Sequence, residues 1–294
     1  MKVPAPLRST ADLARSARRR ILVRIRSRGR ALPLRWEHSP APSSAGRRPR
    51  PPVESLPPLS VVIPVRNEAA RLPLLLADLA AAPASLLREV WAVDGGSGDG
   101  SARLARLAGA RTLASPAGRG EQLRRGVAVS EGPWLLLLHA DARLPAGWPA
   151  EIQRAIRADA QAAWAFPLTI EAAGPALRLV GALSTLRSRW RGLPYGDQGL
   201  LISRALYERS GGLAPLPLME DLEFMLRLRE LAPIRLLRRP LQVDGRRWRR
   251  LGVWRTTWRN ALLRRAWRRG VDPHLLARRY YGEAGGEVGG EAGG

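Results

Sequence analysis

Short apolar runs alternate with longer helical patterns from residue 59 to residue 138. The runs predict strands at 59–64, 90–93, 111–114 and 134–138. The helical pattern fills the intervals at 67–82, 99–107 and 119–130, and Asn67 stands in the capping position of the first helix. Strands that alternate with helices form parallel βαβ units. The pattern therefore predicts an α/β fold with a single, Rossmann-like, mostly parallel sheet flanked by helices on both faces.

Two of these predicted strands run into an acidic residue. Residues 90–93 are followed by Asp94, and residues 134–138 are followed by His139, Ala140 and Asp141. In open α/β sheets, ligands bind in the crevice at the carboxyl ends of the strands. Carboxylates at that edge are explained most economically by a bound metal ion and a nucleotide that carries a sugar.

The composition limits the class of protein. A chain of 294 residues with 45% hydrophobic residues can form one large α/β domain with tails, or two small domains. It contains no cysteine, which excludes disulfides, thiolate metal sites and cysteine nucleophiles. No apolar stretch reaches the roughly 18–20 residues of a membrane-spanning helix, and no apolar signal region follows the first basic residues. We therefore expect a cytoplasmic protein.

The net charge of +24 is concentrated at the two ends of the chain. Residues 59–233 hold 20 basic and 17 acidic residues, whereas residues 1–58 hold 14 and 3, and residues 234–282 hold 15 and 2. Residues 1–58 are predicted to be a basic, proline-rich arm and linker, which is disordered, binds a membrane surface or polyanion, or serves as a transit peptide. The Gly/Glu-rich residues 283–294 are predicted to be a disordered tail. The folded domain is expected at 59–282.

Four polar clusters are candidates for chemistry, and each also has a purely structural interpretation. Residues 94–101 suit either an anion held at a helix start or a plain turn, and the missing Gly-Lys-Ser/Thr ending excludes a Walker P-loop. Residues 139–141 suit a divalent metal or a turn. The acids at 220–223 suit a general base or the stabilisation of a helix dipole. Residues 195–199 suit a pocket lining or a turn.

The order and spacing of these clusters resemble the family-2 nucleotide-sugar glycosyltransferases. The resemblance rests on residues 59–68, 93–100, 138–141, 196–198 and 219–221, and it extends over 59–282. Within that family the chain looks most like a bacterial subgroup associated with radical-SAM and selenium-related domains. The segments that point to this subgroup are 115–122, 186–189, 245–248 and 252–255.

The resemblance implies a GT-A fold and a set of site residues. Asp221 would be the general base, and Asp141, at the last position of a D-x-D motif, would hold Mg²⁺ or Mn²⁺ against the diphosphate. Asp94 would contact the nucleoside, and Asp197 would line the sugar and acceptor pocket. The residues expected to bind the nucleotide sugar are Pro64, Arg66, Glu68, Asp94, Gly95, Arg119, Gln122, Asp197, Gln198, Glu220, Arg247 and Trp248.

The reaction implied by the resemblance is an inverting transfer of a sugar from a nucleoside diphosphate to an acceptor hydroxyl. Two positions depart from the family's pattern: His139 occupies the first position of the D-x-D motif, and Arg124 stands where related sequences often carry asparagine. These departures keep open a catalytically inactive relative that binds nucleotide. The arginine-rich ends keep open a nucleic-acid-binding protein. We expect no nucleic-acid partner, because the acidic strand ends would repel phosphate without a metal.

The basic C-terminal segment has two interpretations. Trp254, Trp258 and Leu262 recur at i, i+4 and i+8 among arginines. This is the pattern of a helix that lies on an anionic membrane surface, or of one that packs its tryptophans on the domain. Membrane docking suits a lipid-like acceptor and a peripheral location on the cytoplasmic face of the plasma membrane.

Overall fold

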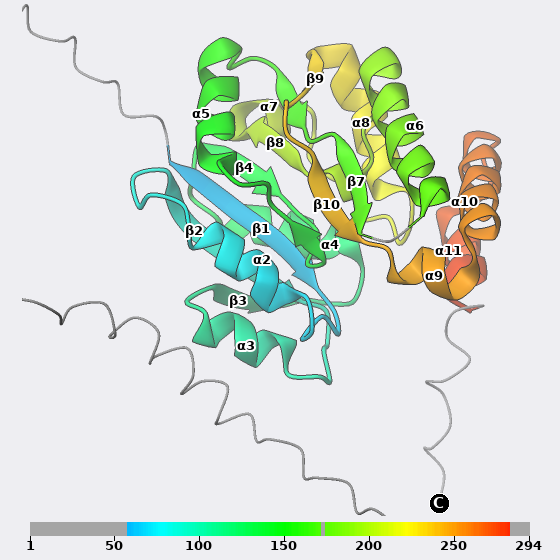
Figure 1. Cartoon of the computed structure of the whole chain (residues 1–294), viewed down its shortest axis with the longest axis horizontal. Coiled ribbons are helices and arrows are strands. Elements are labelled where there is room, and N and C mark those ends of the chain that lie inside the picture. Colours follow the sequence, from blue (N-terminus) through cyan, green and yellow to red (C-terminus); the bar gives the residue numbers. More distant parts are fainter. Residues whose placement is uncertain (1–57, 172–173, 283–294) are drawn as a thin grey trace, which may run out of the picture. The chain divides into compact units, whose positions relative to one another are not determined.

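The computed structural model describes residues 58–171 and 174–282. Its main sheet has seven strands in the order β3-β2-β1-β4-β8-β6-β9 (Figure 1). These strands are β1 (Leu59–Val65), β2 (Leu87–Asp94), β3 (Arg111–Ala114), β4 (Trp134–Leu137), β6 (Ala163–Ala165), β8 (Leu200–Ser203) and β9 (Ile234–Leu236). β1 pairs in parallel with β2 and β4, and β2 with β3, whereas β8 runs antiparallel to β4 and β6. The prediction of a mostly parallel α/β sheet is confirmed.

The predicted arm and tail fall almost wholly outside this range. Residues 1–57, which are the predicted basic, proline-rich arm and linker without its last residue, lie outside the described residues, as do residues 283–294. The domain expected at 59–282 is the part that can be described, apart from residues 172 and 173.

The two faces of the main sheet bury separate hydrophobic clusters. Side chains alternate along a strand, so Val61 and Ile63 of β1 belong to one cluster and Val62 to the other. The first cluster is covered by α2 (Leu72–Leu79), α3 (Ser101–Leu107) and α5 (Trp148–Ala158). The second is covered by α4 (Arg119–Val129), α7 (Arg204–Arg209) and α8 (Glu220–Leu231). Because both faces are covered, every residue of β1 is buried.

A second, three-stranded sheet links the C-terminal part of the chain to the end of β4. It consists of β5 (Ala142–Arg143), β10 (Leu241–Asp244) and β7 (Leu168–Glu171), in that order. Val243 of β10 pairs with Ala142, the residue directly after Asp141. This pairing brings the end of β10 beside the acidic end of β4.

The turn after β1 differs from the prediction. α2 begins at Leu72 and not at Asn67, with Pro73 in its first turn, where the missing N–H of proline costs no helical hydrogen bond. Asn67 has a left-handed backbone with φ of 55°, and its Oδ1 accepts a hydrogen bond from the Gly98 N–H at 2.9 Å. The capping role predicted for Asn67 is therefore wrong. The side chain instead ties the turn after β1 to the glycine-rich loop after β2.

The C-terminal helices pack against the start of α8. α6 (Pro175–Arg191) precedes the short 3₁₀ helix η1 (Gly196–Gln198), and α9 (Arg246–Leu251), α10 (Val253–Arg268) and α11 (Pro273–Gly282) follow β10. Leu263 of α10 and Leu276 of α11 form a third buried cluster with Leu218 and Leu222. Within the two described ranges, no helix is long and apolar enough to cross a membrane.

Candidate active site

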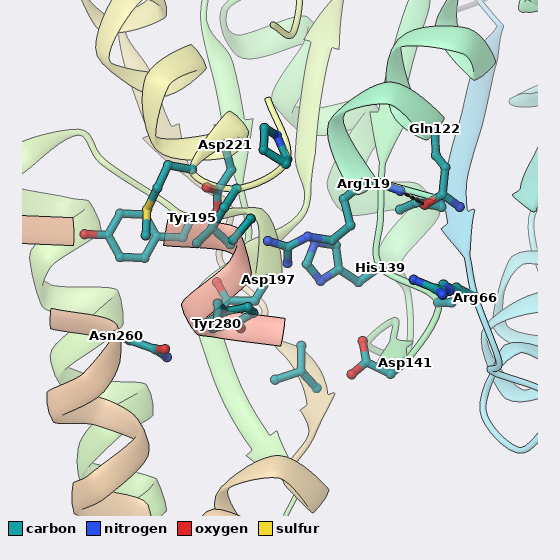
Figure 2. A pocket seen from close by; sticks show the side chains of 18 of the residues that line it. Arg66, Arg119, Gln122, His139, Asp141, Tyr195, Asp197, Asp221, Asn260 and Tyr280 are labelled. Carbon is teal, nitrogen blue, oxygen red and sulfur yellow. Dashed lines mark hydrogen bonds between the residues drawn. The ribbon is translucent and has the colours of Figure 1, made fainter. Parts of the chain in front are cut away.

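A cavity of about 700 Å³ lies at the carboxyl ends of β1 and β4 (Figure 2). The predicted site residues that line it are Pro64, Arg66, Glu68, Arg119, Gln122, Asp141, Asp197, Asp221 and Trp248. Four other predicted residues that the structure describes do not line it: Asp94, Gly95, Gln198 and Glu220. The side chain of Arg247, in α9, lies outside the described part of the structure. The cavity therefore gathers most of the predicted site from segments that are far apart in the sequence.

Asp221 is held by backbone amides at the edge of the cavity. It lies in the first turn of α8, which begins after Met219, a residue with a left-handed backbone at φ of 67°. Its Oδ2 accepts a hydrogen bond from the Gly196 N–H at 2.8 Å, and its Oδ1 accepts one from the Leu222 N–H at 2.7 Å. These two bonds fix the direction of the carboxylate while it still faces the cavity.

Glu220, beside Asp221, positions an arginine. Its side chain is buried, and its Oε1 lies 3.1 Å from Nε of Arg119 at the start of α4. Burial raises the pKa of Glu220, whereas the charge of Arg119 opposes that change. The Arg119 side chain lines the cavity and is about one third exposed. A cation is thus held at a fixed place in the site.

Asp197 is a buried carboxyl in the same cavity. Its Oδ1 is buried and has no hydrogen-bond partner within the described residues. Burial raises the pKa of Asp197 from 3.8 to about 6; Arg187 opposes this change, and the charges of Asp221 and Asp141 add to it. Near neutral pH, this group therefore exchanges a proton more readily than an ordinary aspartate.

His139 lies between the acidic groups. Figure 2 shows its ring beside Arg119, with Asp141 on one side and Asp221 on the other. Burial, together with the charge of Arg119, lowers the pKa of His139 from 6.5 to about 4, against the opposite influence of Asp141 and Asp221. The imidazole is therefore neutral at physiological pH.

Asp141 is the carboxylate best placed to meet a metal ion. It lines the cavity directly before β5, and the described residues show no hydrogen bond or ion pair to its side chain. Within the described ranges, no three His, Asp or Glu side chains come together as a metal cluster. Mg²⁺ is commonly held by one or two carboxylates, with water and substrate phosphates as its other ligands. The residues present fit an ion of that kind and do not form an all-protein cage.

An ion pair links α9 to the turn after β1 across the cavity. Arg246 Nη2 pairs with Glu68 Oε1, and Arg246 Nε lies 3.5 Å from Asp244 Oδ2. Burial raises the pKa of Glu68, and the contact with Arg246 opposes that change. Trp248, two residues further along α9, lines the cavity and packs against the first hydrophobic cluster. α9 is thus tied down over the end of β1.

Gln122 fastens the ends of β1 and β2 together. Its Nε2 donates hydrogen bonds to the carbonyl oxygens of Val65 at 2.9 Å and Val93 at 2.7 Å. A Cβ on Gly95 would lie only 3.0 Å from the carboxamide of Gln122. Glycine at position 95 therefore lets the Gln122 carboxamide lie close to the backbone. The amide nitrogen of Gln122 already donates its hydrogen bonds to protein carbonyls.

Asp94 and Gln198 also bond mainly to the protein. The carboxylate of Asp94 accepts hydrogen bonds from the backbone N–H and the hydroxyl of Ser97, which fixes the glycine-rich loop. Buried Gln198 accepts from Ser188 Oγ at 2.7 Å and donates to the carbonyl of Phe166 at 2.8 Å. Arg124, the second departure from the family's pattern, is exposed and pairs with Glu121 outside the cavity.

The structure adds residues that sequence reasoning missed. Asn260 and Arg264 of α10 and Tyr280 of α11 line the cavity, and Figure 2 shows Asn260 and Tyr280 near Tyr195, which also lines it. The guanidinium carbons of Arg187 and Arg264 lie 3.6 Å and 5.1 Å from the ring centroid of Tyr195. Tyr195 belongs to the cluster at 195–199 that the sequence offered as a pocket lining or a turn, whereas the spacing of the C-terminal helices gave no signal that one of their faces reaches the site.

The fold is that of the GT-A glycosyltransferases. The family model for Glycosyl transferase family 2 matches residues 60–210, more than half of the chain, and the chain belongs to this family. No curated protein sequence matches the chain.

Solved structures share the fold at low sequence identity. TarS 1–349 of S. aureus superposes with a TM-score of 0.51 at 16% identity, over 64% of this chain and 60% of that chain. Its complex with UDP-GlcNAc gives 0.50 at 16% identity, over 64% and 58%. Glucosyl-3-phosphoglycerate synthase from Mycobacterium tuberculosis, in complex with Mn²⁺, UDP and phosphoglyceric acid, gives 0.47 at 19%, over 64% and 68%. The likeness to TarS shows the fold alone, and this chain spans about three fifths of that fragment.

Proposed function

We propose that this protein transfers a sugar from a nucleoside diphosphate sugar to an acceptor hydroxyl, with inversion at the anomeric carbon. The observation that carries the proposal is that Asp141 and Asp221 line one cavity together with the fixed cation of Arg119. Family membership gives the class of reaction. The complex of TarS with UDP-GlcNAc, a protein of the same fold, is consistent with a nucleotide-sugar donor.

The donor is proposed to lie across the ends of β1 and β4. Pro64 and Arg66 would meet the nucleoside, and Arg119 would face the diphosphate. Asp141 is the residue that would hold Mg²⁺ or Mn²⁺, and the ion would neutralise charge on the diphosphate. Asp94, Gly95, Gln122 and Gln198, which bond to the backbone or pack beside it, are proposed to shape this pocket.

Asp221 is proposed to be the general base. It takes the proton of the acceptor hydroxyl while that oxygen forms a bond to the anomeric carbon. The bond from that carbon to the diphosphate breaks at the same time, and its electron pair leaves with the diphosphate oxygen. Arg119, held by Glu220, stabilises the negative charge that develops there. Attack opposite the leaving group inverts the anomeric configuration.

The finer assignments from the sequence belong to the same proposal. We propose that residues 59–282 are the catalytic unit, of the hexosyltransferase type, and that it belongs to the radical-SAM and selenodomain-associated subgroup. The catalytically inactive alternative loses one of its two arguments, because Arg124 lies outside the cavity and pairs with Glu121.

The test is donor cleavage measured with UDP- and GDP-sugars in the presence of Mn²⁺. Asp221→Asn should lower turnover about 10²–10⁴-fold, because the general base is lost, and should still bind donor in calorimetry. Glu223→Gln is the matched control: it removes an acid from the same helical turn, but one that pairs with Arg227 and does not line the cavity. Near-normal turnover by Asp221→Asn would refute the base. A wild-type chain that binds donors without cleaving them would favour the inactive relative.

Asp141→Ala tests the metal site separately. Calorimetric titration of wild-type protein with donor should show tighter binding when Mn²⁺ is present, and the variant should lose that difference. An unchanged effect of Mn²⁺ in the variant would remove Asp141 from the metal site and leave the assignment of Asp221 untouched.

A further inference from the structure

α10 carries a row of large apolar side chains on its outer side. Trp254, Trp258 and Leu262 follow one another at i, i+4 and i+8 and are 64%, 68% and 48% exposed. A shallow groove between them is lined by Trp254, Arg255, Thr257, Trp258 and Ala261. Water-exposed tryptophan is costly, because each ring carries a large apolar area. Two of them on one helical face mark a surface that meets something other than water.

The opposite side of α10 is already occupied by the domain. Thr256 and Leu263 are buried, and Asn260, Leu263 and Arg264 line the cavity. The helix is therefore held in one orientation by its inner side. Of the two interpretations of this segment, the one in which the helix packs its tryptophans on the domain is wrong for Trp254 and Trp258, because their side chains are mostly exposed.

The positive charge around this row of side chains favours an anionic partner. Residues 245–271 contain ten arginines and no aspartate or glutamate. Arg255, Arg265, Arg268 and Arg269 of this segment are exposed. A second copy of the chain would bring the same cationic face to the contact, so repulsion opposes a dimer through it. An anionic lipid surface complements the arginines by its charge and the tryptophans by its acyl and headgroup boundary.

We propose that α10 is a membrane-docking helix, which lies on an anionic bilayer with Trp254, Trp258 and Leu262 at headgroup depth. The arginines beside them bind lipid phosphates, and their aliphatic stems reach to the interface. A helix with its side chains is about 10 Å across, so the cavity lined by Asn260 and Arg264 lies about that distance from the bilayer. If the proposed function holds, the acceptor hydroxyl is therefore reached at the membrane surface.

The experiment is vesicle flotation with the full chain. We use phosphatidylcholine vesicles with and without phosphatidylglycerol, and Trp254→Gln/Trp258→Gln as the test variant. Wild-type protein should float only with the anionic vesicles, less at high salt because charges are screened, and the variant should partition at least tenfold less. Far-UV circular dichroism should be unchanged in the variant, because both side chains are exposed.

The matched control is Arg103→Gln/Leu107→Gln on α3. Arg103 is exposed and Leu107 is 74% exposed, so this variant removes exposed apolar surface, and a positive charge as well, from a different helix. It should float like the wild type. Equal flotation of the tryptophan variant and wild type would overturn the proposal, because binding would then come from another part of the chain.

Two other results would also overturn it. The first is wild-type protein that ignores anionic vesicles but binds poly(U) in a way that the tryptophan variant loses, which would identify a nucleic-acid surface. The second is self-association in sedimentation that depends on the tryptophans, with no vesicle binding. Flotation needs no catalysis, so its failure leaves the donor-cleavage assay and the proposed function unaffected.

Discussion

Asp197→Asn measures how much the burial of one ionised carboxylate lowers the folding stability, because it removes the charge and keeps the shape of the side chain. The pKa of Asp197 is raised by burial from 3.8 to about 6, and its Oδ1 finds no hydrogen-bond partner within the described residues. Asparagine has nearly the same shape and cannot ionise. The variant should therefore change how stability depends on pH, with little change in packing.

The size and sign of the effect follow from the linkage of proton binding and folding. Between pH 3.8 and about 6 the folded chain holds this proton more tightly than the unfolded chain. The stability contributed by protonated Asp197 is complete below that window and is lost as the pH rises through it. The loss is on the order of 3 kcal/mol, from about 1.4 kcal/mol for each unit of pKa difference. At pH 8, Asp197→Asn should therefore be more stable than wild type by up to about that amount.

The assay is urea unfolding followed by tryptophan fluorescence, at pH 4 and at pH 8. The gain from Asp197→Asn should be near zero at pH 4 and largest at pH 8. Glu208→Gln, at a side chain that is 64% exposed, is the control and should change little at either pH. A variant whose stability relative to wild type is the same at both pH values would refute the reasoning, because Asp197 would then not be a buried, uncompensated acid.

Three further predictions concern the frame of the site. Gly126→Ala would place a Cβ 2.3 Å from Val62 Cγ1 and should lower stability by about 1–3 kcal/mol in thermal unfolding. Gly98→Ala is the control, because open space surrounds Gly98, and it should leave the stability unchanged. Equal melting temperatures of the two variants would contradict the packing of α4 on β1. Gln122→Leu should lower the free energy of unfolding by about 1–3 kcal/mol, because two strand-end carbonyls lose a hydrogen-bond donor. Arg124→Gln, at an exposed position on the same helix, is its control. Equal unfolding midpoints of the two variants would mean that the hydrogen bonds of Gln122 do not stabilise the fold. His139 should titrate near pH 4 by NMR, and its contribution to stability should be lost as the pH falls from 6.5 to about 4; a midpoint near 6.5 would show that the ring is solvated.

The sequence alone determined the fold class and predicted which polar residues lie at the strand ends. A buried parallel strand needs a continuous apolar run, and a ligand site needs polar residues where that run stops, so both features are local and visible in the chain. For this reason β1 and β4 were predicted to within one residue, and Asp141 was predicted at the carboxyl edge of the sheet, where it lines the cavity. Periodicity also placed Trp254, Trp258 and Leu262 on one side of a helix, because side chains four residues apart share a side, but only the structure showed that this side is exposed.

Only the tertiary structure decided which polar groups face the cavity and which form hydrogen bonds that hold the surrounding segments together. Asn67 and Gln122 carry the same amide group that a ligand contact or a helix cap would use, but their partners are Gly98, Val65 and Val93, in other segments. The pKa of Asp197 depends on burial and on the charge of Asp221, which the fold alone brings near. Hydrogen-bond partners and desolvation depend on neighbours in space. Local sequence patterns therefore indicate which polar side chains are candidates for a site, and the role of each side chain depends on three-dimensional packing.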